Sequence, residues 1–313
     1  MSSMGGFLLI TESLVSLESV RARIDQVLQA SGKAKEVLDY VASTRGKGLR
    51  PSLVLLIFDL CGGTKVAEAI ECATGVELVH MASLIHDDVI DNSDLRRGLA
   101  TVHRRFGTQT AVLAGDHLFA SAFHLFALSS DRRVSQVMTK VIQDMCTGEI
   151  NQLLSPVATE DDYFNYIHKK TACLIGGCCR LGAILAERSA VEEARFQTFG
   201  ENIGLAFQLT DDVLDYRGED SVMGKTSGKD FDEKLWTLPI IRAYDKRLIG
   251  KDWHTSDFTE IRSLLETHGI LDEVWQLAAA YVQRAIGALE QCPESTPKRE
   301  LTRLVEHIVE RSS

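Results

Sequence analysis

The stretch from Val76 to Gly98 reads VELVHMASLIHDDVIDNSDLRRG and joins an apolar helix to a dense group of acids. Its first part is mostly apolar or small, and then Asp87, Asp88 and Asp91 follow within five positions. On a helix Asp87 and Asp91 lie one turn apart on the same face, with Asp88 beside them. Three ionised carboxylates at this spacing repel one another, and an apolar flank makes each costlier to desolvate. The pattern favours a bound divalent cation, and all-oxygen ligands suit Mg2+.

A second acidic triplet decides between a metal site and a solvated surface patch, which is the commoner origin of an isolated triplet. Residues 207–216 read FQLTDDVLDY and repeat the spacing with Asp211, Asp212 and Asp215, again after an apolar run. Two such triplets favour a metal-binding pair of helices. Placed antiparallel across a cavity, they would hold two or three Mg2+ ions around one diphosphate.

The rest of the chain is typical of an all-α protein. Its five prolines stand at positions 51, 156, 239, 293 and 297, so long helices can run between them. Apolar residues recur at a period of 3.6, and alternating strand-like runs are absent. No internal boundary is evident, so we expect one domain over residues 1–313. The predicted helices cover about 14–32, 34–41, 51–61, 66–92, 134–154, 161–179 and 193–216. Another begins near 108 or 111, two or three more follow 258, and the predicted loops cover 96–106 and 246–258.

Charge and cysteine content narrow the class of protein. The net charge of −10 and pI of about 5.4 argue against general nucleic-acid binding, which needs a basic face. Seven cysteines without zinc-finger spacing favour a reducing cytoplasm. Residues 7–10 lack the basic start of a signal peptide, and no apolar run is long enough to span a bilayer. We therefore expect a soluble, cytoplasmic protein that can still visit a membrane surface.

Two basic segments are candidates for anion binding. Residues 43–51 read STRGKGLRP, where glycines allow a ligand to approach the backbone, although a simple basic turn is an equal alternative. Arg96 and Arg97 directly follow the first triplet. The GKT sequence at 224–226 resembles a phosphate-binding P-loop, but its spacing from Gly218 is one residue too long and no strand precedes it. We reject a P-loop.

Together these motifs, over about residues 46–239, resemble the trans-isoprenyl diphosphate synthase (polyprenyl synthetase) family. The resemblance implies an all-α single-domain bundle around a deep central cavity, of the isoprenoid synthase type. It also implies Mg2+-dependent condensation of isopentenyl diphosphate with an allylic diphosphate such as farnesyl diphosphate. A homodimer is the usual assembly, and a heteromer with a small subunit is an alternative. The product is apolar enough to be handed to a membrane.

The resemblance assigns roles by position. Asp87, Asp88 and Asp91 match the first aspartate-rich motif and Asp211, Asp212 and Asp215 the second, so that Mg2+ held between them would bridge the allylic diphosphate. In the family, further side chains contact the same diphosphate, and their positions correspond here to Arg96, Lys170, Lys225 and Lys229. The site for isopentenyl diphosphate matches Lys47, Arg50, His80 and Arg97. Polar residues beside the reacting carbons match Thr171 and Gln208.

One departure from the family pattern lies ahead of Thr237-Leu238-Pro239. The family commonly has Gly-Lys where this chain has Lys234 and Leu235. The usual lysine is therefore displaced by one position. This weakens the assignment of a third diphosphate-contacting lysine in the loop and leaves the metal sites unaffected.

Product length depends on the residues upstream of Asp87 on the same helix. In the family, bulky aromatic residues at the fourth and fifth positions before the first aspartate stop growth early, and here these are Ser83 and Ala82. The chain should therefore grow past fifteen carbons, with thirty to forty as the best expectation. The segment MASLIHDDVID also resembles the corresponding segment of bacterial long-chain members, including the catalytic subunit of heptaprenyl synthases. The residues expected to share the helix face toward the product tunnel are Gly75, Val76, Val79, Ala82 and Ser83. The deeper floor of that tunnel is expected to be formed by Phe119, Phe123 or Phe126. Phe123→Ala should therefore lengthen the product.

Several alternatives remain open on the sequence alone. A geranylgeranyl diphosphate synthase differs only in length, and a catalytic subunit would need a small partner subunit for activity. A terpene cyclase has no second diphosphate to hold, which Lys47, Arg50 and Arg97 argue against. A phosphohydrolase using His86 and Asp87 needs a further histidine upstream of His80, and none occurs. A non-catalytic partner subunit usually loses one aspartate motif, whereas this chain keeps both, which argues against that alternative. His86 is as well explained by packing beside the metal site.

Overall fold

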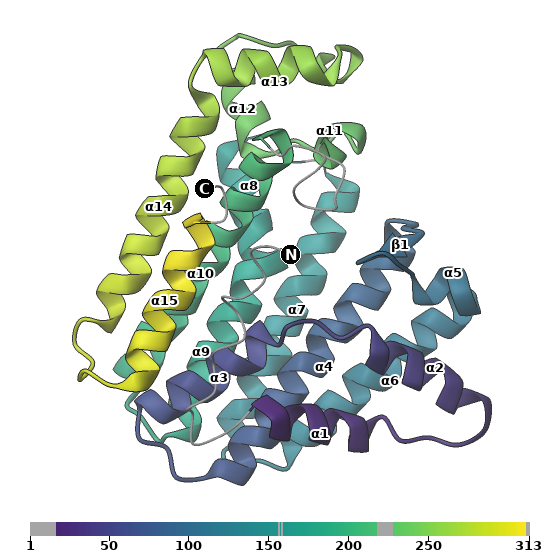
Figure 1. Cartoon of the computed structure of the whole chain (residues 1–313), viewed down its shortest axis with the longest axis vertical. Coiled ribbons are helices and arrows are strands. Elements are labelled where there is room, and N and C mark those ends of the chain that lie inside the picture. Colours follow the sequence, from purple (N-terminus) through teal and green to yellow (C-terminus); the bar gives the residue numbers. More distant parts are fainter. Residues whose placement is uncertain (1–16, 156, 158, 218–227, 311–313) are drawn as a thin grey trace, which may run out of the picture. The chain divides into compact units, whose positions relative to one another are not determined.

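The structure, a computed structural model, describes residues 17–155, 157, 159–217 and 228–310. Its architecture is all-α, as predicted, and the two strands of the described residues form one short hairpin (Figure 1). The elements are α1 (Leu17–Val27), α2 (Gly32–Ser43), α3 (Leu49–Leu60), α4 (Val66–Ile90), β1 (Leu95–Arg96), β2 (Leu99–Ala100), α5 (Val102–Phe106), α6 (Thr108–Ala127), α7 (Arg132–Leu154), α8 (Glu160–Ile167), the π-helix η2 (His168–Ala172), α9 (Cys173–Leu185), α10 (Ala190–Arg217), α11 (Lys229–Asp232), α12 (Leu238–Asp245), the 3-10 helix η3 (Trp253–Thr255), α13 (Phe258–Thr267), α14 (Ile270–Leu289) and α15 (Thr296–Glu310).

Contacts between Cα atoms group the chain into two compact units. Unit 1 comprises Met1–Lys140, Cys178–Phe196 and Glu294–Glu300, and unit 2 comprises Val141–Gly177, Gln197–Pro293 and Leu301–Ser313. Each unit is therefore assembled from stretches that are far apart in the sequence. The expected single domain over residues 1–313 stays a prediction.

Helix α4 is the centre of unit 1. It packs against α1, α3 and α6, and its side chains from Cys72 to Val79 are all buried. A helix that is covered on several sides is mostly apolar or small on all of them, and in this stretch only Thr74 and Glu77 are polar. The acidic residues of the first triplet follow at the end of this buried helix, so packing of the apolar part fixes where they stand.

Two glycines allow α4 and α6 to approach closely. A Cβ atom on Gly75 of α4 would lie 2.6 Å from the ring of Phe126 on α6, and one on Gly115 of α6 would lie 2.2 Å from Nε2 of His86 on α4. Both distances are shorter than van der Waals contact, so any larger residue forces the helices or the aromatic side chains to move. The two contacts also show that α4 and α6 run antiparallel.

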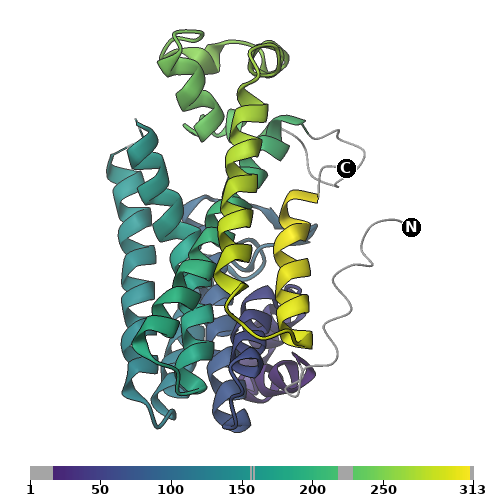
Figure 2. The ribbon, with the colours of Figure 1, turned by 90° about the vertical axis from the view of Figure 1, so that its left-hand side faces the viewer.

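Unit 2 has a core of its own, built mainly from α8, α12, α13, α14 and the later part of α10. Helix α13 packs on α14, and in Figure 2 it is seen nearly end-on beyond the end of α14. The predicted surface loop over 246–258 contains η3, whose Trp253 is buried against Phe231 at a ring distance of 5.5 Å. The loop is therefore anchored to the core of unit 2.

Two further predictions of secondary structure were wrong in detail. The region 96–106, predicted as a loop, contains part of the β1–β2 hairpin and the whole of α5. The helix predicted over 161–179 is divided by η2, where five residues including Lys170 and Thr171 form a π-helical turn. Both are local tertiary effects that apolar periodicity does not encode.

The helices and the cysteines bear on the expected absence of membrane spans and disulfide bridges. Among the described residues, none of the helices is both long and apolar enough to cross a membrane. No disulfide joins any of the seven cysteines, all of which lie in the described residues.

Gly115→Ala should destabilise the protein, because the added methyl group collides with His86 and overpacking of this kind typically costs about 1–3 kcal/mol. Gly287→Ala on α14 is the matched control, since a Cβ there meets nothing within 4 Å. Helix propensity alone predicts that the control gains up to about 1 kcal/mol. Chemical denaturation of both variants measures the difference, and equal effects would contradict the close packing of α4 on α6.

Candidate active site

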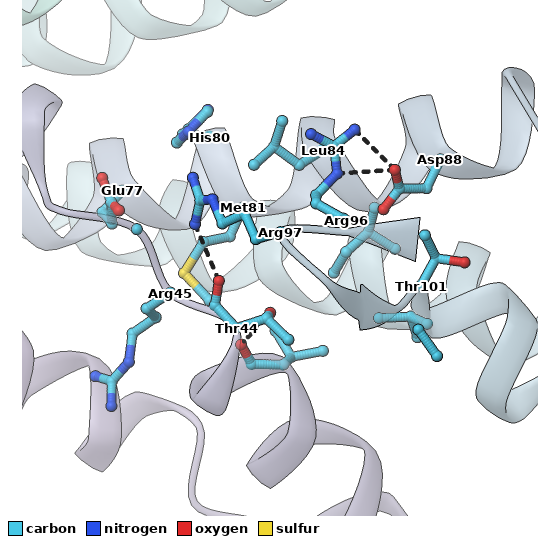
Figure 3. A pocket seen from close by; sticks show the side chains of 15 residues that line it. Thr44, Arg45, Glu77, His80, Met81, Leu84, Asp88, Arg96, Arg97 and Thr101 are labelled. Carbon is cyan, nitrogen blue, oxygen red and sulfur yellow. Dashed lines mark hydrogen bonds and ion pairs between the residues drawn. The ribbon is translucent and has the colours of Figure 1, made fainter. Parts of the chain in front are cut away.

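The first acidic triplet stands at the C-terminal end of α4. Asp87 is half-buried, Asp88 is only 4% exposed, and Asp91 is exposed at the C-cap position. Oδ1 of Asp88 accepts from Nε of Arg96 at 2.8 Å and lies 2.7 Å from its Nη2 (Figure 3). The buried carboxylate is thus paired with a guanidinium, and two groups predicted for the metal and for diphosphate hold each other in this structure.

Arg97 turns toward the basic segment at 43–51. Its Nη1 donates to the carbonyl oxygen of Thr44 at 3.1 Å, and its guanidinium lies so close to Gly46 that a Cβ there would be 2.9 Å from Nη2. The glycine is needed at this position because the arginine occupies the space of a side chain. The two basic segments of the sequence are therefore brought together in unit 1.

A pocket lies where these groups meet, and Figure 3 shows the cationic side chains gathered around it. It is lined by Val41, Thr44, Arg45, Gly46, Glu77, His80, Met81, Leu84, Ile85, Asp88, Arg96, Arg97, Ala100, Thr101 and Val102. Of the residues predicted to bind isopentenyl diphosphate, His80 and Arg97 belong to this lining and Lys47 and Arg50 do not. Lys47 is exposed, whereas Arg50 is half-buried and its buried Nε has no hydrogen-bond partner in the described structure.

The electrostatics of the pocket favour an anion. Burial lowers the pKa of Arg50, Cys178 and Glu77 oppose that shift, and Arg97 adds to it. Burial, followed by the charges of Arg50, Arg97 and Arg96, holds the pKa of His80 well below its usual value. His80 is therefore neutral at pH 7 and offers a hydrogen bond without adding charge.

Glu77 is a pocket residue that sequence reasoning missed. It is one turn before His80 on α4, only 4% exposed, and it lines the pocket. Burial raises the pKa of Glu77, and Arg50 and Arg97 act in the opposite direction. Its position in an apolar run, spaced to face His80, was the available sequence signal.

The second acidic triplet is supported by a chain of hydrogen bonds within unit 2. Asp212 is 2% exposed; its Oδ2 accepts from the hydroxyl of Tyr163 at 2.6 Å, and its Oδ1 accepts from Nε2 of Gln208 at 2.9 Å. The hydroxyl of Thr171 donates to Oε1 of Gln208 at 3.3 Å. Thr171 and Gln208, which we predicted to act together, are thus in direct contact, although their role beside the reacting carbons stays a prediction.

Asp215 fixes the chain that follows the undescribed segment. Its carboxylate oxygens accept from the backbone N–H groups of Lys229 at 3.2 Å and Asp230 at 3.0 Å, at the start of α11. This brings Asp230, a second residue that sequence reasoning missed, next to the triplet. Burial, and then the charges of Asp212, Asp215 and Asp211, raise the pKa of Asp230 to about 8.

The donor set in unit 2 fits a divalent cation. Burial raises the pKa of Asp212 to about 7; the hydrogen bonds from Tyr163 and Gln208 lower it, and the charges of Asp211 and Asp215 raise it again. Four carboxyl groups thus share a region where each ionised group disfavours the others, and a cation relieves this repulsion. Within the described residues, no group of three His, Cys, Asp or Glu side chains is placed so that it could hold a metal ion by itself. Mg2+ commonly takes one or two carboxylates and completes its shell with water and substrate phosphate.

Lys170 is held in place by α7 and by its own helical turn. Its Nζ lies 2.7 Å from Oε1 of Glu149 and 5.3 Å from the ring centre of Tyr166. Burial opposes the charged form, but Tyr166 and Glu149 outweigh it and raise the pKa of Lys170 above its usual value. Gly148 allows this approach, because a Cβ there would lie 2.8 Å from Cβ of Lys169.

The remaining predicted lysines are less constrained. Lys229 is exposed and lies 3.3 Å from Glu233, and Lys225 lies outside the described residues. Lys234 is exposed and has a φ of 58°, a left-handed conformation that glycine adopts at lower cost. The position where the family commonly has glycine thus keeps a glycine-like backbone here.

The predicted chain-length residues are placed as follows. Val79 and Ala82 are fully buried, and the hydroxyl of Ser83 donates to the carbonyl oxygen of His80 at 2.9 Å. Phe123 is 38% exposed on α6, whereas Phe126 is the buried aromatic that contacts α4. Their influence on product length stays a prediction.

His86 has contacts typical of a packing residue. Its Nε2 lies 3.1 Å from the carbonyl oxygen of Val112 and 3.7 Å from Asp116, and its ring centre is 5.7 Å from that of Phe119. These contacts are with α6, which favours the packing interpretation of this histidine.

Asp230→Asn should stabilise the metal-free protein at pH 8. The pKa values of Asp212 and Asp230, about 7 and about 8, lie above the ordinary 3.8, so the folded state binds more protons than the unfolded chain between about pH 4 and pH 8. Stability therefore falls as pH rises through this window. Removing one of these charges should raise the melting temperature at pH 8 by roughly 2–5 °C and leave it nearly unchanged at pH 5.

Asp232→Asn is the control, because Asp232 is exposed two residues further along α11. A gain of the same size in the control, or one that does not depend on pH, would contradict the proposed repulsion. Thermal denaturation followed by circular dichroism in EDTA measures both variants.

Comparison with known proteins places the chain in a family. Residues 32–264 match the sequence profile described as Polyprenyl synthetase. Relatives include an octaprenyl diphosphate synthase of Haemophilus influenzae, 34% identical with 87% of each chain covered. They also include heptaprenyl diphosphate synthase component 2 of Geobacillus stearothermophilus, 32% identical over 88% of this chain and 90% of the relative. A geranylgeranyl diphosphate synthase of Methanosarcina mazei is 33% identical, with 88% and 91% covered.

The fold is shared with a solved relative. A polyprenyl synthase of Caulobacter crescentus, complexed with calcium and isoprenyl diphosphate, superimposes with a TM-score of 0.84 and 30% sequence identity, over 95% of this chain and 96% of that one. The matched profile covers both aspartate triplets and the described cationic residues around them. The chain therefore belongs to the polyprenyl synthetase family and is a prenyltransferase.

Proposed function

We propose that the protein adds isopentenyl diphosphate to an allylic diphosphate such as farnesyl diphosphate and releases diphosphate, building an all-trans product longer than fifteen carbons. The observation that supports this most is that each unit holds an aspartate triplet at the end of an apolar helix with cationic side chains nearby. Such sets of groups suit a reaction in which a diphosphate leaves and a carbocation remains.

Mg2+ is the proposed metal, in two or three ions, and the residues that would hold it are Asp87, Asp88, Asp91, Asp211, Asp212 and Asp215. When bound, the metal neutralises charge that develops on the departing diphosphate. Asp88 and Asp212 already accept hydrogen bonds from protein donors, so their orientation is set before a metal arrives. The calcium in the Caulobacter crescentus relative supports a divalent cation in this family.

The side chains of this protein would act on the allylic diphosphate as fixed cations and orienting groups. Arg96, Lys170, Lys225 and Lys229 would contact its oxygens and stay charged throughout. Thr171 and Gln208, already bonded to each other, would orient the reacting carbons. Apolar side chains such as Val79 and Ile85 of α4 are buried, and a dry environment prevents water from trapping the cation.

Isopentenyl diphosphate would bind at the cationic pocket of unit 1. Arg97 and His80 line that pocket, with Arg50 beside them and Lys47 exposed on the loop before α3. Because His80 is neutral, it would form one hydrogen bond with the substrate, and the neighbouring arginines would neutralise the charge of the diphosphate. After its double bond attacks the cation, the proton is lost, and the released diphosphate is a plausible acceptor.

Product length is proposed as thirty to forty carbons. The small side chains of Ala82 and Ser83 support growth past fifteen, since neither is an aromatic stop. The relatives described above are geranylgeranyl, heptaprenyl and octaprenyl diphosphate synthases, so geranylgeranyl diphosphate is the second candidate. Phe123 or Phe126 is proposed as the deeper limit.

Assembly is proposed as a homodimer. Helix α6 exposes several large apolar side chains on its outer face, namely Val112, Leu113, Phe123 and Leu128. Burial of such residues in a second copy is favourable, and a small partner subunit is the alternative, as the name of the Geobacillus stearothermophilus relative suggests. We also propose a cytoplasmic location with transfer of the apolar product to a membrane.

The test is incubation of the purified protein with radiolabelled isopentenyl diphosphate, farnesyl diphosphate and Mg2+, followed by chromatography of the dephosphorylated products. A discrete product of about thirty to forty carbons is expected, with loss of activity in EDTA. A twenty-carbon product would instead identify a geranylgeranyl diphosphate synthase. No elongation, alone or with cell extract as a source of a partner subunit, would contradict the proposed function.

A further inference from the structure

Arg96 and Arg97 are consecutive residues, yet the proposed function gives them to two different substrates. Arg96 contacts Asp88 at the end of α4, whereas Arg97 contacts Thr44 and lies against Gly46, in the loop between α2 and α3 (Figure 3). Neighbouring residues with flexible side chains would otherwise compete for one anion. A feature of the backbone must therefore keep them apart.

The feature is the β1–β2 hairpin. Leu95 pairs with Ala100 and Arg96 with Leu99, which leaves Arg97 and Gly98 as a two-residue turn. Both turn residues have positive φ, 54° for Arg97 and 78° for Gly98. Two positive φ values are the property of the type I′ turn, whose twist matches that of an antiparallel pair. A left-handed conformation is costly for arginine, so the surrounding contacts must impose it.

The strand and the turn send the two side chains in different directions. Arg96 is the last residue of β1 and points back to α4, where its Nε and Nη2 both contact Oδ1 of Asp88. Arg97 is the first residue of the turn and reaches the loop at 44–46. Because Arg96 ends the strand and Arg97 stands in the left-handed turn, the hairpin directs the two guanidinium groups to different partners.

Several contacts outside the proposed substrate-binding set fasten the hairpin. The hydroxyl of Tyr40 on α2 donates to the carbonyl oxygen of Ala100 at 2.5 Å, at the residue that pairs with Leu95. The guanidinium of Arg105 stands 4.2 Å above the Tyr40 ring, and the ring of Phe106 packs edge-on at 5.6 Å. α5 and α2 thus hold Tyr40 in position for that bond.

The base of the hairpin is closed by Thr101. Its backbone N–H donates to the carbonyl oxygen of Asp94 at 3.0 Å, and its hydroxyl donates to the carbonyl oxygen of Ser93 at 2.8 Å. Ser93 in turn donates its N–H to the carbonyl oxygen of Asp88 at 2.9 Å. The hairpin is therefore tied directly to the end of α4.

We propose that the β1–β2 hairpin is a rigid spacer that divides two adjacent arginines between two diphosphates, with Tyr40 as the positioning residue that holds the Arg97 side. The inference rests on the proposed function for the identity of the two anions. Arg96 has its own anchor in Asp88, whereas Arg97 depends on the turn and on Tyr40. Loosening the turn should therefore weaken isopentenyl diphosphate binding and spare the allylic diphosphate.

Gly98→Ala is the sharpest test, because a Cβ on Gly98 meets nothing within 4 Å and adds only the cost of positive φ. Gly269→Ala carries the same type of cost at φ 69°, also without contacts within 4 Å, in unit 2 at the start of α14. Titration calorimetry of the full chain gives two dissociation constants, one for isopentenyl diphosphate alone and one for farnesyl diphosphate with Mg2+. Neither measurement requires turnover.

For Gly98→Ala we expect the dissociation constant for isopentenyl diphosphate to rise roughly 5- to 20-fold and that for farnesyl diphosphate to change less than about 2-fold. Gly269→Ala should change neither. Equal weakening of both substrates by Gly98→Ala, or no weakening of either, overturns the inference. Wild-type protein that binds neither substrate would instead defeat the proposed function.

Tyr40→Phe provides a second variant that keeps the ring and removes only the hydroxyl. It should weaken isopentenyl diphosphate about 3- to 10-fold, the usual effect of one lost hydrogen bond, with the same selectivity. Tyr244→Phe, on α12, is the matched control and should leave both constants unchanged. A Tyr40→Phe protein that matches the wild type in both constants would remove Tyr40 from the positioning role.

Discussion

Carboxylates at the ends of apolar helices are the constraint on which the rest of the site depends. Asp88 and Asp212 are almost completely buried, and an ionised carboxylate in such a place is unfavourable without compensating donors. The structure supplies them as Arg96 in unit 1 and as Tyr163 with Gln208 in unit 2. These donors orient the two acids before a cation arrives.

The donors offset only part of the cost of burying ionised carboxylates, and this suits the proposed binding of a cation. In unit 2 burial and the neighbouring carboxylates keep the pKa values of Asp212 and Asp230 raised to about 7 and about 8, so a cation would favour their ionised forms. In unit 1 the charges are of the opposite sign, because burial and then Arg50, Arg97 and Arg96 depress the pKa of His80. One region therefore favours a metal ion and the other an anion, which are the two partners of a metal diphosphate.

The sequence predicted the all-α class and the bounds of α4, because a long apolar run and the absence of proline are strong helix signals. The paired triplets also led to a predicted metal site, and the family resemblance added the cationic residues; the roles of both sets stay predictions. The family resemblance assigned both Thr171 and Gln208 to the reacting carbons, and the two are in contact in unit 2. Asp88 and Arg96, predicted to bind the metal and the diphosphate, are paired with each other in the structure, and their ligand roles stay predictions.

Features created by tertiary contact were not predictable from spacing. The hairpin uses an Arg-Gly turn, and arginine at positive φ is not a usual turn signal. The π-turn of η2 disrupts no apolar pattern, so nothing in the sequence marks it. Tyr163 is linked to the second triplet by a hydrogen bond to a residue 49 positions away, which spacing along the chain does not reveal.

The central claim is that these carboxylates bind a diphosphate only through a divalent cation. Its most direct measurement is calorimetric titration of farnesyl diphosphate into the purified protein, once with Mg2+ and once with EDTA. The account predicts at least a tenfold lower dissociation constant with Mg2+, since without it the acids repel the anion. Equal affinity in EDTA would contradict the account, because the cationic side chains alone would then suffice.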